Sequence, residues 1–386
     1  MKMIHTGDWH IGKLVHGMHM TRDQEQVLEQ FTAHLREKRP DVVLLAGDIY
    51  DRTIPPVEAV ELLDRVLTEI VLERKIPVIA ISGNHDSGER LGFAGGILQR
   101  QGLHIHNRLE QVGKPVVLED GHGPVHFYPI PYADPAEARV LYGDETIRTH
   151  DDVFRAVMER IRPRMDRNVR NVCIAHGFVG GLELAASESE RPLSIGGTET
   201  VDRAHFDGFH YVALGHLHRP QKAGRDRIRY AGSLMKYSFS EAEQPKGMLE
   251  VELDGEGGVE LESVVFPPPR DMRVIRGELA NLVRKDVYEA QNCQDFIMAV
   301  LTDEGELHEP MATLRSVYPN ILKLERGMRT QVGSGEMALV ERDYAAKAPL
   351  DIFRQFYGQV EGEAMEAVQE ELLKDVLRDV EKGGVL

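Results

Sequence analysis

The chain has 386 residues, of which 42% are hydrophobic and 28% charged, a composition typical of globular proteins with room for two or three domains. No stretch approaches the roughly 20 consecutive apolar residues of a membrane helix, and two cysteines exclude a disulfide framework. The first motif begins so close to Met1 that we expect no signal peptide and a cytoplasmic protein. The net charge of −17 argues against a protein that binds nucleic acid through its own basic surface.

Two considerations keep nucleic acid open as a partner. A pair of divalent cations would add about four positive charges at the place where a phosphate sits. Five arginines also lie between residues 160 and 170, although a solvated helix end and loop is the simpler interpretation of that run. Composition alone therefore leaves the partner undecided.

Apolar runs alternate with amphipathic stretches over the first hundred residues. Residues 23–38 carry Val27, Phe31 and Leu35 at helical spacing, and the next apolar run covers 42–46. Pro55-Pro56 opens a second helix, for which we expect one buried face. The residues of that face are Val57, Val60, Leu63, Leu67 and Ile70. A third run at 78–81 and a glycine-rich helical stretch to 101 complete a pattern that predicts parallel βαβ units with layers on both sheet faces.

Shorter strands are expected between residues 115 and 131, with no helix between them. A helix marked by Val153, Val157 and Ile161 then precedes a strand that ends at His176. Residues 177–205 are rich in glycine and poor in apolar side chains, which predicts a long, functional loop. Short strands follow around 228–232, 247–253 and 258–266.

Three consecutive prolines at 267–269 predict a domain boundary, so we divide the chain into residues 1–269, 270–345 and 346–386. The middle part shows strands near 273–277, 296–302 and 320–325 and a helix near 285–291, which indicates a small α+β domain. The last part is predicted to be helical, with an apolar stripe. The stripe consists of Met365, Val368, Leu372, Val376 and Val380.

Five apolar runs end abruptly in residues that bind metals. The candidate ligands are Asp8, His10, Asp48, Asn84, His176, His216 and His218. Because the loops after parallel strands gather at one edge of a sheet, we expect these side chains to meet. Cys173 lies within one of the runs, and we interpret it as a core residue.

Seven nitrogen and oxygen donors are too many for one ion and suit two ions, roughly 3.5 to 4 Å apart, that share a bridging carboxylate. Imidazole, carboxylate and amide donors without thiolate favour manganese, iron or zinc. Any single fragment is more often a hydrogen-bonded polar group, and Asn84-His85-Asp86 is also typical of a turn. Five fragments in succession, each ending a hydrophobic strand, favour the two-metal site.

A family resemblance rests on four motifs, Gly7-Asp8-x-His10, Gly47-Asp48, Gly83-Asn84-His85-Asp86 and Gly215-His216-x-His218, which resemble those of calcineurin-like metallophosphoesterases. The opening His5-Thr6-Gly7-Asp8-Trp9-His10-Ile11-Gly12-Lys13 and residues 349–357 are similar to the bacterial SbcD nuclease subunits, which are Mre-type double-strand-break nucleases. The motif match covers residues 1–266, and the remainder resembles the family in order and length. The resemblance implies an α/β fold, a two-sheet metallophosphoesterase sandwich flanked by helices, with a small α+β capping domain and a C-terminal helical segment.

The resemblance also assigns the ligands. One manganese ion would be held by Asp8, His10 and His218, the other by Asn84, His176 and His216, with Asp48 bridging the two. The ions would stabilise negative charge on the transferring phosphate.

Two catalytic residues are implied in addition. His85 follows the ligand Asn84 and is expected to stay free of metal, so it is the candidate proton donor to the leaving oxygen. Asp51 is expected to orient His85.

By the same resemblance the chain is expected to be a metal-dependent DNA nuclease subunit, a double-strand exonuclease and a hairpin or single-strand endonuclease in DNA repair, recombination and replication. Its expected partners are DNA, a second copy of the chain, and an SbcC-type coiled-coil ATPase bound through the C-terminal segment, together forming a heterotetramer. Packing of the apolar stripe on its own domain is the alternative for that segment.

A small-molecule phosphodiesterase or phosphatase of the same superfamily is the alternative function, and a non-catalytic scaffold is a third. The long chain after Pro269 argues against the small-molecule enzyme, because the chemistry needs only the first part. The complete ligand set argues against the scaffold.

Overall fold

The computed structural model describes residues 1–180, 187, 190 and 200–327, together with short pieces of the C-terminal segment at 350, 353–354, 357, 365 and 369–374. The chain divides into two compact units, Met1–Arg326 and Gly327–Leu386. None of the helices in the described part is long and apolar enough to cross a membrane.

The first sheet has the strand order β14-β13-β1-β4-β5-β6. Its strands are β1 (Lys2–Thr6), β4 (Val42–Leu45), β5 (Val78–Ile81), β6 (Leu103–His106), β13 (Gly247–Leu253) and β14 (Val259–Val265). Strands β1, β4, β5 and β6 run parallel, and the antiparallel hairpin β13–β14 extends the sheet beside β1. Every residue of β4 and β5 is buried, as expected of strands covered on both faces.

The second sheet has the order β11-β12-β10-β9-β8-β7. Its strands are β7 (Val116–Asp120), β8 (Gly123–Ile130), β9 (Arg170–His176), β10 (Tyr211–Gly215), β11 (Gln221–Ala223) and β12 (Arg225–Tyr230). The four inner strands are parallel and the two edge strands antiparallel. The hairpin β7–β8 accounts for the short strands predicted at 115–131.

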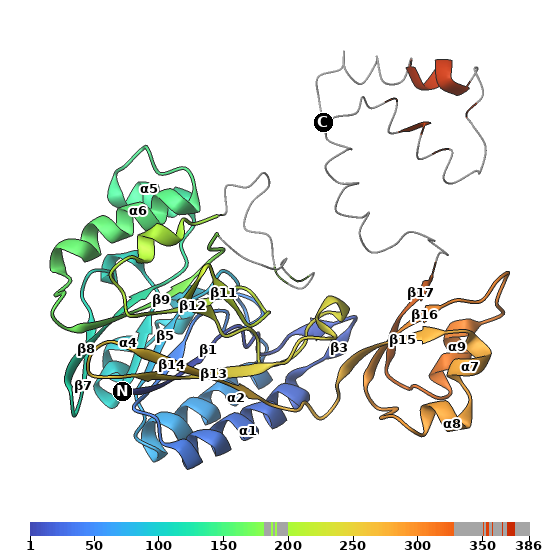
Figure 1. Cartoon of the computed structure of the whole chain (residues 1–386), viewed down its shortest axis with the longest axis horizontal. Coiled ribbons are helices and arrows are strands. Elements are labelled where there is room, and N and C mark those ends of the chain that lie inside the picture. The colour runs from blue at the N-terminus through green and yellow to red at the C-terminus, as the bar shows by residue number, and fades with distance from the viewer. Residues whose placement is uncertain are drawn as a thin grey trace. The chain divides into compact units, whose positions relative to one another are not determined.

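The two sheets pack face to face through one apolar core. Met3, Leu44 and Ile79 of the first sheet meet Phe127 and Ile174 of the second. On the outer faces, α1 (Thr21–Lys38) and α2 (Val57–Thr68) cover the first sheet, and α5 (Pro135–Tyr142) and α6 (His150–Ile161) cover the second (Figure 1). This confirms the two-sheet sandwich flanked by helices that the family resemblance implies.

Helix α1 buries Val27, Phe31 and Leu35, which confirms the predicted face. The face predicted for α2 is wrong at its start, because Val57 is 69% and Val60 44% exposed. The helix buries Ala59, Leu62, Leu63 and Val66 instead. The small side chain of Ala59 faces the core beside Gly12, whose backbone passes so close that a Cβ there would lie 3.1 Å from Cβ of Ala59. Val57 and Val60 are therefore left on the surface.

Shorter elements fill the connections. They are β2 (Leu14–Val15), β3 (Met18–His19), the π-helical turn η1 (Glu69–Glu73), α3 (Gly88–Leu91), α4 (Gly95–Leu98) and the 3-10 turns η2 (Gln99–Gln101), η3 (Leu109–Gln111), η4 (Arg162–Arg164), η5 (Arg203–Phe206) and η6 (Phe239–Glu241). The glycine-rich stretch expected to be helical to 101 is thus broken into α3, α4 and η2.

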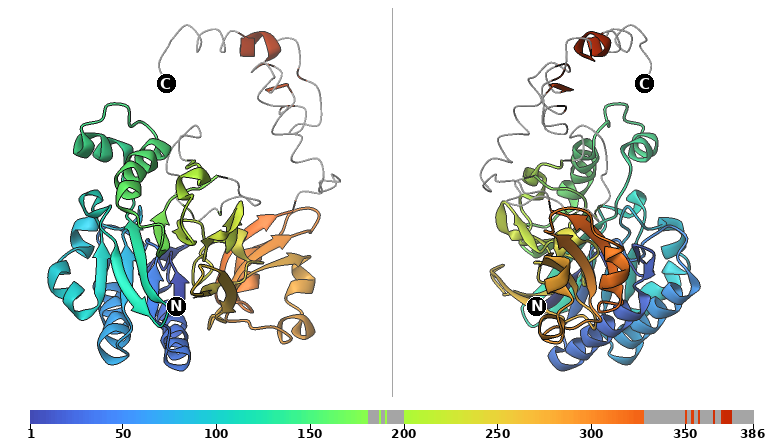
Figure 2. Two further views of the ribbon diagram at one scale, coloured as in Figure 1. Left: turned by 60° about the vertical axis from the view of Figure 1, so that its left-hand side comes forward. Right: turned by 90° about the vertical axis from the view of Figure 1, so that its right-hand side faces the viewer.

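A third, parallel sheet lies beside the sandwich (Figure 2). It contains β15 (Met272–Gly277), β16 (Phe296–Leu301) and β17 (Ile321–Arg326), with α7 (Leu279–Leu282), α8 (Lys285–Tyr288) and α9 (Pro310–Arg315) between them. It has its own apolar core, and Met272 and Phe296 also pack against the core of α1 and α2. The strands agree with those predicted, whereas α8 is shorter than the helix expected at 285–291.

The arginine run before β9 makes contacts within the fold. Arg170 is buried and paired with Asp120 at 2.6 Å, and the guanidinium of Arg160 lies 3.6 Å from the ring centre of Tyr142. These contacts favour the structural interpretation of the run. Cys173 is completely buried, in line with its expected place in the core.

The predicted C-terminal stripe falls mostly outside the described residues. Of its members, Met365 and Leu372 are described; Met365 is half-buried and Leu372 is 69% exposed. Nearby, Glu370 pairs with Arg354 and, at 2.8 Å, with Lys374.

Candidate metal centre

The candidate ligands lie after the carboxyl ends of five parallel strands from two different sheets. Strands β1, β4 and β5 belong to the first sheet, and β9 and β10 to the second. The packed sheets bring these ends to one edge of the sandwich. Asp8 follows β1, and its backbone N–H donates to the carbonyl of Gly47 after β4, which ties two of the loops together.

The first group of ligand atoms comes from Asp8, His10 and Asp48, which lie within 4.8 Å of one another. His218 joins this group, since its Nε2 is 3.0 Å from Nε2 of His10. All four side chains are almost completely buried.

The second group comes from Asp48, His176 and His216, also within 4.8 Å of one another. Asn84 joins it, because its Oδ1 lies 2.9 Å from Nε2 of His176 and 3.2 Å from Nδ1 of His216. Asp48 is common to both groups. Its Oδ2 lies 3.6 Å from Nε2 of His10 and 3.4 Å from Nε2 of His176.

The backbone is strained at four of these residues. Asp8, His10, Asp48 and His216 have φ angles of 52°, 46°, 49° and 105°, which lie in the left-handed region that residues other than glycine rarely adopt. Each such residue costs on the order of 1 to 3 kcal/mol and persists only where the surrounding fold enforces it. The left-handed conformations thus occur at four residues whose side chains belong to the ligand groups.

Two glycines of the motifs permit a close approach of the loops. A Cβ on Gly83 would lie 2.2 Å from Oδ1 of Asp48, and a Cβ on Gly215 would lie 1.9 Å from the carbonyl oxygen of Ala46. No larger residue fits at either position without displacing the ligand loops. Steric exclusion of any side chain therefore explains why a glycine precedes Asn84 and His216.

The pKa values of the Asp8 and Asp48 carboxyl groups are shifted in opposite directions. Burial raises the pKa of Asp8, and the nearby charge of Asp48 raises it further. Burial acts on Asp48 in the same direction, but the charge and hydrogen bond of His176 outweigh it and hold the pKa of Asp48 well below its usual range. The pKa of His176 is lowered by burial and raised by Asp48, with a net increase. Positive charge at this place stabilises both carboxylates.

The donor set fits divalent cations. Oδ2 of Asp8 is buried and has no hydrogen-bond partner among the described residues. An unpaired buried carboxylate oxygen is costly, and a cation satisfies it. Carboxylate, imidazole and amide oxygens are suitable ligands for manganese, iron or zinc.

His85 and Asp51 lie at the rim of the first group. Nδ1 of His85 donates to the backbone carbonyl of Asp51 at 2.8 Å, and the backbone N–H of His85 donates to Oδ1 of Asp48 at 2.9 Å. The Asp51 carboxylate pairs with Lys13 at 2.8 Å and lies 3.6 Å from Nδ1 of His10. Asp51 thus contacts His85 through its backbone carbonyl. Its carboxylate lies near both histidines, since one ligand atom each from His10, Asp51 and His85 lie within 4.8 Å of one another.

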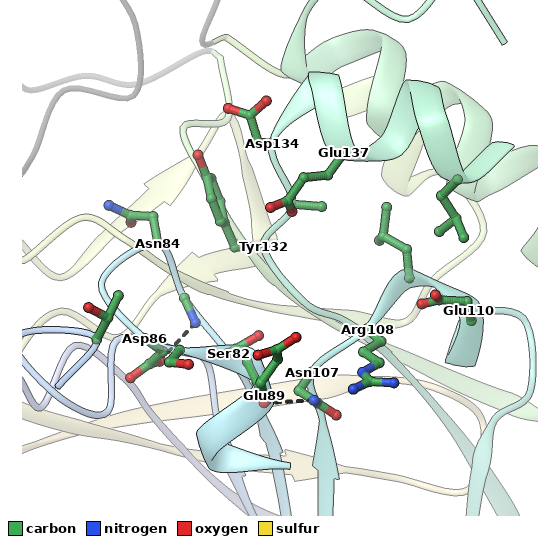
Figure 3. Close-up of a pocket in the computed structure, with 17 residues that line it drawn as sticks. Ser82, Asn84, Asp86, Glu89, Asn107, Arg108, Glu110, Tyr132, Asp134 and Glu137 are labelled. Carbon is green, nitrogen blue, oxygen red and sulfur yellow. Dashed lines mark hydrogen bonds between the residues drawn. The ribbon is translucent and has the colours of Figure 1, made fainter. Parts of the chain in front are cut away.

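A polar cavity of about 660 Å³ opens beside Asn84. Figure 3 shows Asn84 and Tyr132 next to each other on one side of it, and Asn107 and Arg108 on the other. Asp86, in its wall, accepts hydrogen bonds from the backbone N–H groups of residues 49, 50 and 83. The cavity therefore adjoins the second ligand group through Asn84.

Several residues of the centre are not evident in the sequence. Lys13 follows the first motif, but its partner Asp51 comes from a loop 38 residues away. Glu241 and Lys246 lie behind His218, in a region whose sequence predicts only short strands. Glu190, from the long loop after β9, accepts the backbone N–H of His218. Nothing in their local patterns distinguishes these residues from ordinary surface charges.

Comparison with known proteins matches the calcineurin-like phosphoesterase model to residues 1–220. A second model, SbcD_C, described as the type 5 capsule protein repressor C-terminal domain, matches residues 268–361. Among solved structures, a protein from Thermus thermophilus is 13% identical with a TM-score of 0.38, covering 68% of this chain and 98% of its own. A dimetal phosphatase from Danio rerio is 11% identical with a TM-score of 0.36, covering 65% of this chain and 91% of its own.

Manganese is expected to raise the melting temperature of the metal-free chain. An ion that binds only the folded state stabilises it by about 2.7 kcal/mol at 100 times its dissociation constant. Asp48→Asn should lose most of this gain because Asp48 belongs to both groups, whereas Asp226→Asn changes an exposed carboxylate and should keep it. Calorimetry with EDTA and with Mn²⁺ measures the difference. An unchanged gain in Asp48→Asn would contradict a shared ligand.

Proposed function

Because the chain belongs to the calcineurin-like phosphoesterase family and is thus a hydrolase of phosphoesters, we propose that it is a metal-dependent DNA nuclease subunit that cleaves phosphodiester bonds at duplex ends and hairpins. The observation that carries the proposal is the pair of ligand groups that share Asp48. The match of the C-terminal model to residues 268–361 supports the nuclease over other phosphoesterases.

The proposed ligands divide as the two groups divide. Asp8, His10 and His218 would hold one ion. Asn84, His176 and His216 would hold the other, and Asp48 would be shared by both. Two manganese ions there would supply Lewis-acid stabilisation of the charge on the transferring phosphate.

His85 is proposed to donate a proton to the leaving oxygen. A carbonyl only accepts hydrogen bonds, so the contact with Asp51 keeps a proton on Nδ1. The proton given to the leaving oxygen is therefore a second one, carried on Nε2 by the doubly protonated ring, and Nε2 is left with the lone pair after the transfer. The backbone N–H bond to Asp48 sets the distance of His85 from the ligand groups. Asp51 is proposed as a positioning residue that acts through its carbonyl on His85 and through its carboxylate on His10.

The capping and partner roles are proposals for the rest of the chain. We assign residues 1–269 to the nuclease domain, 270–345 to a capping domain and 346–386 to the segment that binds an SbcC-type coiled-coil ATPase. A cytoplasmic location is consistent with the free thiols of Cys173 and Cys293.

The nuclease should degrade linear duplex DNA when manganese is present and should stop when EDTA is added. The matched assay offers a generic phosphodiester, such as bis-(p-nitrophenyl) phosphate, under the same conditions. Hydrolysis of the small ester without cleavage of any DNA substrate would favour the alternative function, a small-molecule phosphodiesterase or phosphatase.

His85→Ala should lower the rate of DNA cleavage by at least about 100-fold, the contribution expected of a general acid, while two ions per chain are retained. Metal content by elemental analysis and cleavage rate are measured on the same preparation. His122→Ala, in the exposed turn between β7 and β8, is the control and should change neither. Loss of metal from His85→Ala would show that His85 is a ligand and would end its assignment as the proton donor.

An exposed apolar surface supports the proposed homodimer. Its residues come from α2 and the segment before it, from η1, and from α4 and the turn between α3 and α4, and we call it the α2–α4 patch. Its large exposed side chains are Ile54, Val57, Val60, Leu72, Phe93 and Ile97. Several of them line a groove of about 480 Å³. Contiguous exposed apolar side chains of this kind mark interaction sites, and a second copy related by a two-fold axis would cover the patch with the same patch.

Phe93→Glu should weaken dimerisation by on the order of 100-fold, because it places a carboxylate in an apolar interface. Phe93 is 81% exposed in the single chain, so the substitution leaves the fold intact. The control is Val140→Glu on α5, where the replaced side chain is 84% exposed and lies outside the patch. Sedimentation equilibrium measures both. A dimer that Phe93→Glu leaves unchanged would exclude the patch as its interface.

A further inference from the structure

A buried network of charged residues lies behind His218. Nδ1 of His218 is 3.2 Å from Oε1 of Glu241, and Oε2 of Glu241 is 2.7 Å from Nζ of Lys246. Glu241 is completely buried, and the side chains of His218 and Lys246 are 1% and 3% exposed. Burying these charges is tolerated because they neutralise one another.

The Glu241 contact determines which nitrogen of His218 carries the proton. A carboxylate only accepts, so the proton lies on Nδ1 and the lone pair on Nε2. Nε2 is the atom that faces His10 in the first ligand group. A carboxylate behind a histidine both fixes its ring and makes it a stronger metal ligand.

The backbone of His218 is held as firmly as its ring. Its carbonyl accepts from Nζ of Lys246 at 2.7 Å, and its N–H donates to Oε1 of Glu190 at 2.5 Å. Ser187, three residues before Glu190, donates through its hydroxyl to Oε1 of Glu241 at 2.6 Å. The loop after β9 and the η6 region therefore meet at one histidine.

In the second group, His176 has a different support. Nδ1 of His176 donates to the carbonyl of Ala46 at 2.8 Å, a neutral acceptor. In the first group His10 also has a carboxylate behind it, that of Asp51, at 3.6 Å. The two positions are thus chemically unequal.

We propose that Glu241, held by Lys246 and Ser187, is a positioning residue that fixes the Nδ1-protonated form of His218 and makes the Asp8–His10–His218 position the tighter of the two metal sites. The inference rests on the two-metal site proposed above. Glu190 contributes by fixing the backbone of the same residue.

The test is an isothermal calorimetric titration of the metal-free full-length chain with Mn²⁺, which measures the two affinities separately. Wild type should bind two ions with unequal affinities. Glu241→Gln should weaken the tighter site by about 10- to 100-fold and leave the weaker one unchanged. Glu243→Gln, two residues away and exposed, is the matched control and should behave as wild type.

In Glu241→Gln the buried ammonium of Lys246 loses its carboxylate partner, which could prevent folding. The double variant Glu241→Gln with Lys246→Met removes both charges and keeps the test valid in that case. It should show the same selective loss. Two wild-type affinities in a folded Glu241 variant, or an equal loss at both sites, would overturn the inference. Fewer than two ions bound by wild type would instead refute the two-metal site itself.

Discussion

The Asp48 carboxylate is buried between the ends of two sheets, with Oδ2 within 3.6 Å of His10 from one sheet and 3.4 Å of His176 from the other. A buried carboxylate without compensation costs several kcal/mol. Its compensation here comes from His176, the last residue of β9, from the backbone N–H of His85 after β5, and from any cation that the site binds. The charge is therefore satisfied only when both sheets are formed and packed together.

The apolar core between the two sheets therefore helps to position the metal ligands. The left-handed conformations of Asp8, His10, Asp48 and His216 are unfavourable individually, and rigid strands on both sides are needed to enforce them. The apolar side chains between the sheets provide this rigidity, since tight packing resists small displacements. Ligands placed at strand ends are held more accurately than ligands within flexible loops.

The sequence predicted what depends on local pattern. Continuous apolar runs such as 42–46 predicted buried parallel strands, and the polar residues that end them predicted which side chains gather. The prediction failed where contacts with residues distant in the sequence determine which side chains are buried or positioned. Val57 and Val60 have helical spacing, but Ala59 faces the core, and only the packed structure shows this. Glu241 and Glu190 acquire their place through contacts with His218 that cross 23 and 28 residues, and no periodicity records such contacts.

The balance of charges at the centre explains how an acidic chain can attract a phosphoester. Among the proposed ligands only Asp8 and Asp48 are anionic, so two divalent ions would leave the site with a charge of about +2. Two neighbouring carboxylates are balanced by lysines, Glu241 by Lys246 and Asp51 by Lys13. Glu190 and Asp86 instead accept hydrogen bonds from backbone N–H groups. A net charge of −17 spread over the whole molecule is screened within about 10 Å at moderate salt, whereas the local excess acts at contact distance. Histidine-rich coordination is what preserves the positive charge, since each further carboxylate ligand would remove one unit of it.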